Sequence, residues 1–252
     1  MHMRLVRVKV KTDMVSELAR LYENRIIPAL EHVKGCRYAG LMQSARQPDE
    51  CLSLTLWNSE TDAREYEQSG VFISLLDESR TYFLESSDFK IQLSDNLTLE
   101  YVPVPEEPVV STFAVAAAGT SDDDVSATAG SIWVRIVSLK LRPDSADAFK
   151  QDYIARVIPA LRSVRGCRYA YLTERADQPN EVISVTSWAS RQDAEAYERS
   201  GLFVKLLESQ QHLLSELYQW KKSHERTDNV DVTTSEDVAV EHYNVVVGRS
   251  FT

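Results

Sequence analysis

The pentapeptide Gly35-Cys36-Arg37-Tyr38-Ala39 occurs a second time in this chain, as Gly166-Cys167-Arg168-Tyr169-Ala170. The difference 166 − 35 gives a shift of 131 residues, and the same shift superposes Arg25–Leu30 on Arg156–Leu161. About 35 of roughly 85 superposed positions are identical without a gap, which is typical of an internal duplication. The sequence therefore predicts two small domains of one kind, joined in a single polypeptide.

The domain boundaries follow from the repeat and from a change in composition between the copies. We expect the first repeat to span 1–101 and the second repeat, with a C-terminal strand, to span 131–252. Between them, 102–130 is rich in proline, alanine and aspartate, and few of its residues after Ala116 are large and apolar. Such a composition is typical of a flexible linker.

Charge and composition exclude several partners and cofactors. A net charge of −10 argues against nucleic acid and anionic membranes, because both require a basic face. The apolar run Val109–Ala118 is too short to span a bilayer, and the N-terminus lacks an apolar signal core, so we expect a cytoplasmic protein. The cysteines Cys36, Cys51 and Cys167 include no C-x-x-C pair, so we expect core packing and no metal site.

Hydrophobic periodicity predicts the first elements of each repeat. Leu5–Lys11 alternates apolar and polar residues, as a strand does, and Leu18–Val33 has apolar residues at helical spacing. Pro28 lies inside that helix and should kink it. Cys36–Gln43 and Cys51–Trp57 then predict two antiparallel strands, and the second copy repeats every one of these elements.

A second helix and a late strand complete each copy. Ser59 and Ser190 are suitable helix caps, and we expect the helices that follow to run to about Leu84 and about Leu217. Asp88–Tyr101 and Val238–Val247 are expected to be late strands that cross over and close the neighbouring copy's sheet. The order β–α–β–β–α with a late strand describes a ferredoxin-like α+β unit, whose helices cover one face of its sheet. Two such sheets packed face to face make a barrel.

Five short motifs carry a family resemblance in both copies. In the first copy they are Pro28-Ala29-Leu30, Gln47–Glu50, the strand end Thr55–Trp57, Ser59–Ala63, and Tyr66–Phe72. With these motifs, about 85 residues of each copy resemble the antibiotic biosynthesis monooxygenase domain. The resemblance implies a dimeric α/β barrel, formed here within one chain as a pseudo-dimer. Further association into a homo-oligomer stays open.

The haem-degrading branch of that family is similar enough to compare residue by residue. The resemblance implies an asparagine in the first strand, a tryptophan in the second helix and a histidine ligand about ten residues later. The asparagine position falls on or near Arg7 and Ser138, and Tyr66 and Tyr197 occupy the tryptophan position. Leu76 and Leu207 occupy the histidine position, and leucine offers haem iron no axial ligand. We therefore disfavour haem degradation.

The cofactor-independent branch oxidises quinol-type substrates in a flat apolar pocket, without metal or flavin. The resemblance implies a strand with an asparagine four residues before a tryptophan. Trp57 and Trp188 match the tryptophan, whereas Ser53 and Ser184 stand in place of the asparagine. Serine stabilises a developing oxyanion more weakly than asparagine does, which weakens the inference of activity.

Strand parity selects the candidate ligand pocket. Alternate residues of a strand share a face, so the row from Ser53 to Trp57 forms one polar and aromatic surface between sheet and helices. We expect it to bind a small hydrophobic or aromatic molecule, with a tyrosine hydroxyl at the pocket mouth; packing in the core is the alternative. The candidates are Ser53, Thr55, Trp57, Tyr66, Ser184, Thr186, Trp188 and Tyr197.

Weaker candidates are Arg37, Tyr38, Arg168 and Tyr169, which recur in both copies. The arginines could hold an anionic substrate, but we favour ion pairs with Glu50 and Glu181 on the adjoining strand. Two function classes remain: a cofactor-independent monooxygenase of quinol-type substrates, or a non-catalytic ligand-binding or scaffold module.

Overall fold

The computed structural model describes residues 1–93, 99–105, 107–120, 132–175, 178, 180–215 and 238–251. For 86–93, 99–105 and Thr120 it describes the backbone alone. Residues 121–130 of the expected linker lie outside the described part of the chain.

Ten strands are described, and eight of them are hydrogen-bonded in a closed order. Their bounds are β1 (His2–Lys9), β2 (Cys36–Ser44), β3 (Glu50–Trp57), β4 (Glu85–Leu93), β5 (Leu99–Pro105), β6 (Val109–Thr120), β7 (Trp133–Lys140), β8 (Cys167–Glu174), β9 (Glu181–Trp188) and β10 (Val238–Ser250). The closed order is β1-β3-β2-β10-β7-β9-β8-β6, and β4 and β5 form a separate two-stranded sheet. This order confirms the predicted α+β barrel class.

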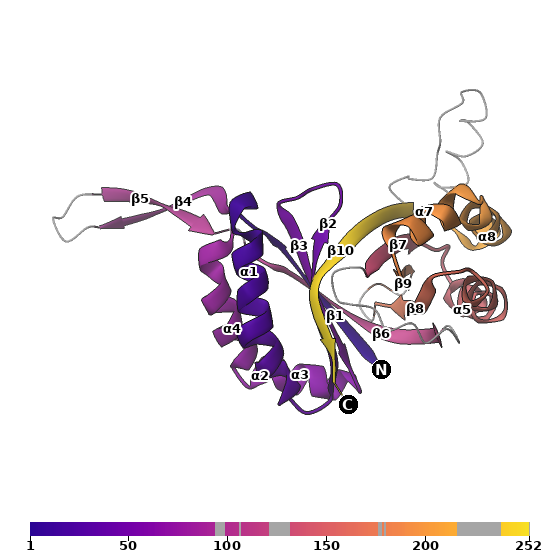
Figure 1. Ribbon diagram of the computed structural model, residues 1–252, viewed down its shortest axis with the longest axis horizontal. Coiled ribbons are helices and arrows are strands. Elements are labelled where there is room, and N and C mark those ends of the chain that lie inside the picture. Colours follow the sequence, from indigo (N-terminus) through magenta and orange to yellow (C-terminus); the bar gives the residue numbers. More distant parts are fainter. Residues whose placement is uncertain are drawn as a thin grey trace, which may run out of the picture. The chain divides into compact units, whose positions relative to one another are not determined.

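The helices occur at equivalent places in the two repeats (Figure 1). In the first repeat they are α1 (Val15–Leu21), a π turn (Tyr22–Ile26), α2 (Ile27–Glu31), α3 (Glu60–Gln68) and α4 (Val71–Ser79). In the second they are α5 (Ala146–Asp152), a π turn (Tyr153–Val157), α6 (Ile158–Arg162), α7 (Arg191–Arg199) and α8 (Leu202–Gln210). Short 3₁₀ turns span Thr12–Met14, Arg80–Tyr82 and Gln211–Leu213.

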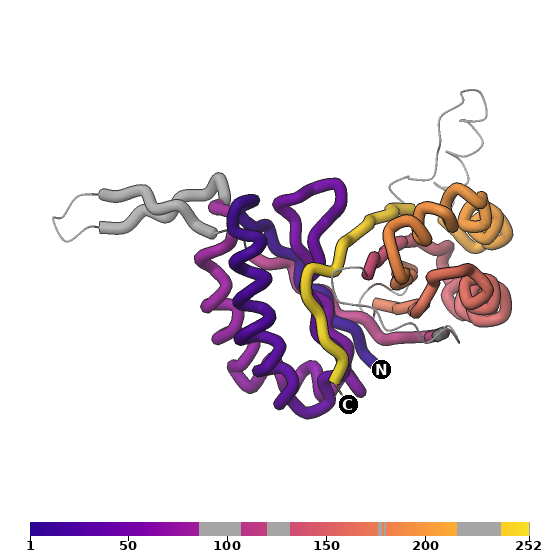
Figure 2. Tube along the Cα trace, viewed as in Figure 1, coloured from indigo at the N-terminus to yellow at the C-terminus, as the bar shows by residue number. Residues whose placement is uncertain are grey.

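The chain divides into two compact units that exchange their terminal segments. One unit contains Arg4–Ser111 and Val246–Thr252, and the other contains Met1–Met3 and Thr112–Val245. Figure 2 shows the C-terminal residues, in yellow, running beside the strands of the first repeat, and Phe251 N–H donates to the Arg37 carbonyl at 2.8 Å. The C-terminal end of β10 therefore contributes to the unit of the first repeat, and most of β6 contributes to the unit of the second. Of the predicted crossing strand Val238–Val247, only Val246 and Val247 lie in the unit of the first repeat.

The segments that make this exchange differ from our expectation in the first repeat. Asp88–Tyr101 falls within the separate sheet of β4 and β5. The crossing strand is β6, which occupies much of the expected linker and pairs antiparallel with β8 from Ala114 to Thr120. Phe113 and Ala117 of β6 are buried, so this segment gains enough apolar burial to be ordered despite its small residues.

The expected second helix of each repeat is two helices. Gly70 separates α3 from α4 with φ +79°, and Gly201 separates α7 from α8 with φ +72°. A left-handed residue cannot continue a right-handed helix, and glycine adopts that conformation without a steric cost. As predicted, Ser59 and Ser190 cap α3 and α7 by accepting from the backbone N–H of the third following residue.

Each proline that we expected to kink the first helix instead follows a π turn. Ile27 N–H donates to the carbonyl of Tyr22, five residues earlier, and Ile158 donates to Tyr153 in the same way. Pro28 has no N–H, and its ring would crowd the carbonyl four residues before it in a regular α-helix. The wider turn relieves this conflict without ending the helix.

Both units have a hydrophobic core between helices and sheet. Trp57 and Trp188 are completely buried at its centre. Cys36, Cys51 and Cys167 are free and buried, and burial raises the pKa of each thiol to about 12, so they pack as small apolar groups. In the described part of the chain, no helix is both long and apolar enough to cross a bilayer.

Candidate ligand-binding cavities

Each unit contains a cavity between its helices and its sheet. The cavity of the first repeat has a volume of about 60 Å³, and that of the second repeat about 40 Å³. These volumes hold a few water molecules, whereas pockets for larger ligands measure about 300–1,000 Å³. Neither cavity, as it stands, has room for a ring-sized ligand.

A tyrosine–serine pair lies in each cavity wall. The Tyr22 hydroxyl and Ser53 Oγ are 2.7 Å apart, and the Tyr153 hydroxyl and Ser184 Oγ are also 2.7 Å apart. Both tyrosines are the first residues of the π turns, so the irregular backbone carries a polar side chain into the cavity. Burial raises the pKa of Tyr22 and Tyr153, so these hydroxyls stay protonated at neutral pH.

A threonine–tryptophan pair, present in both repeats, follows the serine along β3 and β9. Trp57 Nε1 donates to Thr55 Oγ1 at 2.9 Å, and in the second repeat Trp188 Nε1 donates to Thr186 Oγ1 at 3.0 Å. Each indole stacks on a cavity-lining tyrosine, with centroids 5.0 Å apart for Tyr66 and 4.9 Å apart for the second repeat. The tryptophans therefore support the cavity wall from behind.

A buried arginine lines each cavity from the first strand of the repeat. Arg4 and Arg135 have side chains only 3% exposed. Arg4 Nε donates to Glu67 Oε1 at 2.7 Å, and its guanidinium carbon lies 3.9 Å from the ring centroid of Phe72. Its Nη2 is buried and has no hydrogen-bond acceptor within the described part of the chain, and the same holds for Arg135 Nη2. A ligand acceptor that displaced the aromatic ring would satisfy this donor.

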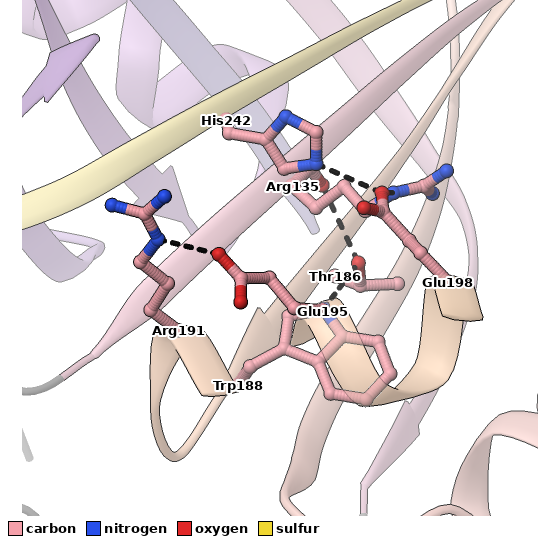
Figure 3. Close-up of polar contacts among 7 residues, drawn as sticks. All are labelled: Arg135, Thr186, Trp188, Arg191, Glu195, Glu198 and His242. Atoms are coloured by element: carbon pink, nitrogen blue, oxygen red, sulfur yellow. Dashed lines mark hydrogen bonds and ion pairs between the residues drawn. The ribbon is translucent and has the colours of Figure 1, made fainter. Parts of the chain in front are cut away.

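The second repeat extends its arginine pair with a histidine (Figure 3). Arg135 Nε donates to Glu198 Oε1 at 2.6 Å, and His242 Nε2 lies 2.8 Å from the same oxygen. Burial raises the pKa of Glu198, but the hydrogen bond with His242 and the charge of Arg135 outweigh it and lower the pKa to about 2. Thr186 Oγ1 also reaches the Arg135 carbonyl at 3.4 Å, which ties β9 to β7 at this point.

The structure places most of the predicted pocket residues around the cavities. Ser53, Thr55 and Tyr66 line the first cavity. Their repeat equivalents Ser184, Thr186 and Tyr197 line the second. Trp57 and Trp188 touch the lining tyrosines but are not themselves part of the lining.

The weaker candidates lie outside both cavity linings. Arg37 Nε donates to Asn58 Oδ1 at 2.6 Å, and Glu50 pairs with Arg7 at 2.6 Å, so the predicted Arg37–Glu50 ion pair is wrong. In the antiparallel pairing of β2 and β3, Arg37 lies beside Trp57 at one end, whereas Glu50 lies at the other end, next to the Gln43–Cys51 pair, so the two charges cannot meet.

The second copy shows the same outcome. Glu181 lies 4.0 Å from Lys140 and 3.8 Å from Arg175, in place of the predicted pair with Arg168. Tyr169 is 46% exposed and stacks on Tyr171. Tyr38 is half-buried, and its hydroxyl packs beside Gly40 and Gly248. A Cβ atom at either glycine would clash with this hydroxyl.

Sequence reasoning missed the arginine, the π-turn tyrosine and the phenylalanine of each cavity. A signal for Arg4 was present, because it shares strand parity with Val6 and Val8 and is therefore a charge on the apolar face. The duplication marks the same set, since Arg4, Tyr22 and Phe72 recur unchanged at the 131-residue shift. A buried charge kept in both copies is a strong indication of a site.

The family model described as antibiotic biosynthesis monooxygenase matches residues 1–75 and 133–209, which is more than half of the chain. This chain belongs to the antibiotic biosynthesis monooxygenase family. The match covers both repeats and most of the two cavity linings; the lining residues beyond it are Leu76, Ser79, Phe83 and Gln210.

Solved structures share the fold of this family member at low sequence identity. A candidate monooxygenase from Lactobacillus acidophilus NCFM is 9% identical with a TM-score of 0.65, covering 99% of this chain and 95% of that one. One from Fusobacterium nucleatum subsp. nucleatum is 8% identical with a TM-score of 0.66, covering 99% and 94%. An anthrone oxidase-like protein is 15% identical with a TM-score of 0.53, covering 99% and 93%. No curated protein matches this chain.

Proposed function

We propose that this antibiotic biosynthesis monooxygenase family protein binds a small hydrophobic or aromatic molecule in the cavity of each repeat and oxidises it without a cofactor, as a monooxygenase of quinol-type substrates. The observation that carries the proposal is the buried arginine with an unpartnered Nη2 in an otherwise apolar wall. A guanidinium in such a wall stabilises the anion that a quinol forms when it loses a proton. The protonated tyrosine hydroxyls beside it provide a further donor for the substrate oxygen.

The second candidate is a non-catalytic binding module, and one observation favours it. In the described cavity linings, neither a carboxylate nor an imidazole faces the ligand space, so no ordinary general base is present. Burial raises the pKa of Tyr66, and it raises that of Tyr197 to about 12, so neither tyrosine removes a proton at neutral pH. Oxygenase activity therefore requires a substrate that is acidic enough to lose its proton without a protein base, once the arginine has lowered its pKa.

Haem degradation remains disfavoured because the residues present do not fit haem. Leu76 and Leu207, at the positions of the implied histidine ligand, line the cavities with apolar side chains. Iron needs an axial nitrogen, sulfur or oxygen donor. Among the residues whose side chains are described, no group of three or more histidine, cysteine, aspartate or glutamate residues could hold a metal ion.

The buried free thiols support a reducing, cytoplasmic setting.

Oxygen uptake with anthrone and 1,4-dihydroxynaphthalene tests this function. We expect uptake above the spontaneous rate, falling at least about 10-fold in a double variant with Arg4→Met and Arg135→Met, because each lost charge destabilises the bound anion. The carboxylate partners Glu67 and Glu198 are 37% and 31% exposed, so they stay partly hydrated when the arginines are removed.

The matched control is the double variant with Arg37→Met and Arg168→Met, a repeat-related arginine pair outside both cavities. Its uptake should equal that of the wild type. Binding of both compounds without any catalysed uptake would favour the non-catalytic module. Equal uptake in the wild type and the Arg4/Arg135 variant would contradict the role of the arginines.

A further inference from the structure

The two cavities have the same polar lining except at one position. Five polar side chains recur in the two linings at the 131-residue shift: an arginine, two tyrosines, a serine and a threonine. The sixth polar residue is Ser79 in the first cavity and Gln210 in the second. Any difference in polar recognition between the cavities is therefore concentrated at this pair.

The serine is already satisfied within its own helix, whereas the glutamine is not. Ser79 Oγ donates to the Leu75 carbonyl at 2.8 Å, so it offers no donor to a ligand. Gln210 is only 3% exposed, and its Nε2 has no acceptor within the described part of the chain. Burying an amide donor without a partner destabilises the free protein, so a ligand that supplies the acceptor gains affinity.

The position of Gln210 separates its donor from that of Arg135. Phe203 lies over the Arg135 guanidinium, 4.0 Å from ring centroid to guanidinium carbon. Gln210 follows Phe203 on α8 by 210 − 203 residues, which is about 10 Å along a helix axis. Leu206 and Leu207 line the cavity between them. The second cavity therefore has a separate polar end at Gln210, distant from the arginine.

The charge balance indicates which acceptor this end receives. Arg135 is paired with Glu198, and Gln210 is uncharged, so the lining presents no free positive charge at the glutamine. A carboxylate would lose its hydration there without a compensating cation. A neutral carbonyl oxygen, as in a ketone or quinone, accepts from the amide at a much smaller desolvation cost.

We propose that Gln210 is a specificity-determining residue that gives the second cavity a stronger preference than the first for apolar ring compounds with a carbonyl group over the corresponding hydrocarbons. The unpartnered arginine donor is common to both cavities, so the difference between them rests on Gln210. The proposal rests on the proposed function only in that both cavities bind small apolar molecules. It assigns different ligand preferences to two sites that the duplication made alike.

Calorimetric titration with 1-indanone and indane tests this preference, because the two probes differ mainly by the carbonyl oxygen. We expect the preference for 1-indanone over indane to be about 10-fold larger at the second cavity than at the first, the effect of one buried hydrogen bond. Gln210→Ser should remove this difference between the cavities and leave indane affinity unchanged. The reciprocal variant Ser79→Gln should raise the preference of the first cavity to that of the second.

The outcomes separate this inference from the proposed function. Equal preference for 1-indanone over indane at the two cavities, or a difference between the cavities that survives in Gln210→Ser, would overturn the role of Gln210 while leaving ligand binding intact. Binding of neither probe to the wild type would count against both. Gln210→Met supplies a measurement that needs no ligand, because it keeps the side-chain volume and removes the unpartnered donor. Its Tm should exceed that of the wild type, and a lower Tm would contradict an unsatisfied amide in the free protein.

Discussion

At the scale of single residues, both copies have an ion pair between a buried arginine and a glutamate, and the second copy adds a histidine to it. Arg4–Glu67 and Arg135–Glu198 are equivalent, but only the second pair has His242 on the same carboxylate oxygen. A buried arginine without its carboxylate is costly, which explains why both members of the pair recur.

The pKa of Glu198 predicts how acid affects stability. Its folded value of about 2 lies below the ordinary value of 4.5, so its stabilising contribution is present above pH 4.5 and is lost as the pH falls toward 2. Glu198→Gln should remove roughly 1–3 kcal/mol of unfolding free energy at pH 7, and less at pH 3, after allowance for solvent screening. Urea unfolding at both pH values measures this.

Glu195→Gln is the control for this prediction, because Glu195 is on the same helix and pairs at the surface with Arg191 (Figure 3). Glu195 also pairs with Arg199. We expect it to change stability little at either pH. An equal loss at pH 7 and pH 3 in Glu198→Gln would show that packing, and not the charge, determines its contribution.

At the scale of elements, a few special backbone positions shape the cavity walls. The π turns carry Tyr22 and Tyr153 into the cavities, and left-handed glycines break each second helix where the lining phenylalanine follows. Sequence periodicity predicted the helices but neither irregularity. Each π turn changes the helical period over one turn only, which is too short a stretch for the apolar pattern to reveal, and a single Gly within an apolar pattern does not reveal the sign of its φ.

Two glycines of the first repeat provide a matched test of backbone strain and packing. Gly35 and Gly70 have φ +81° and +79°, but a Cβ at Gly35 would lie 2.4 Å from Asp62 Cγ, whereas none of the surrounding atoms lies within 4 Å at Gly70. Gly70→Ala should therefore cost about 1 kcal/mol of stability, and Gly35→Ala about 2–4 kcal/mol, because it also displaces the capping Asp62.

Chemical denaturation of both variants measures the difference. Equal destabilisation would show that Asp62 moves aside freely and that backbone strain alone determines the cost. A further variant, Gly35→Ala with Asp62→Ala, should recover part of the loss if the side-chain clash is responsible.

At the scale of the whole molecule, the terminal segments link the folding of the two repeats. Val246–Thr252 belongs to the compact unit of the first repeat, where Phe251 is buried in the core. A chain ending at Val245 should therefore lose about 2–4 kcal/mol of stability in that unit, from lost Phe251 burial and lost hydrogen bonds. Hydrogen exchange of the α1–α4 amides measures the loss.

Phe251→Ala in the full-length chain separates the side chain from the backbone contribution. It should give part of the effect of the truncation, with faster exchange again concentrated in the first repeat. Faster exchange confined to α5–α8 would contradict the assignment of the C-terminal residues to the first unit.

By itself, the sequence determined that this chain has two copies of one α+β unit, because a gapless repeat and strand and helix periods are local properties of the chain. It also identified the Ser53-to-Trp57 row, since strand parity follows from backbone geometry. Only the tertiary structure decided that Trp57 supports the cavity from behind, that Arg4 lies within it, and that β6 is the strand that crosses over. These depend on which distant segments pack together, and burial energies between such segments leave no periodic trace in the chain.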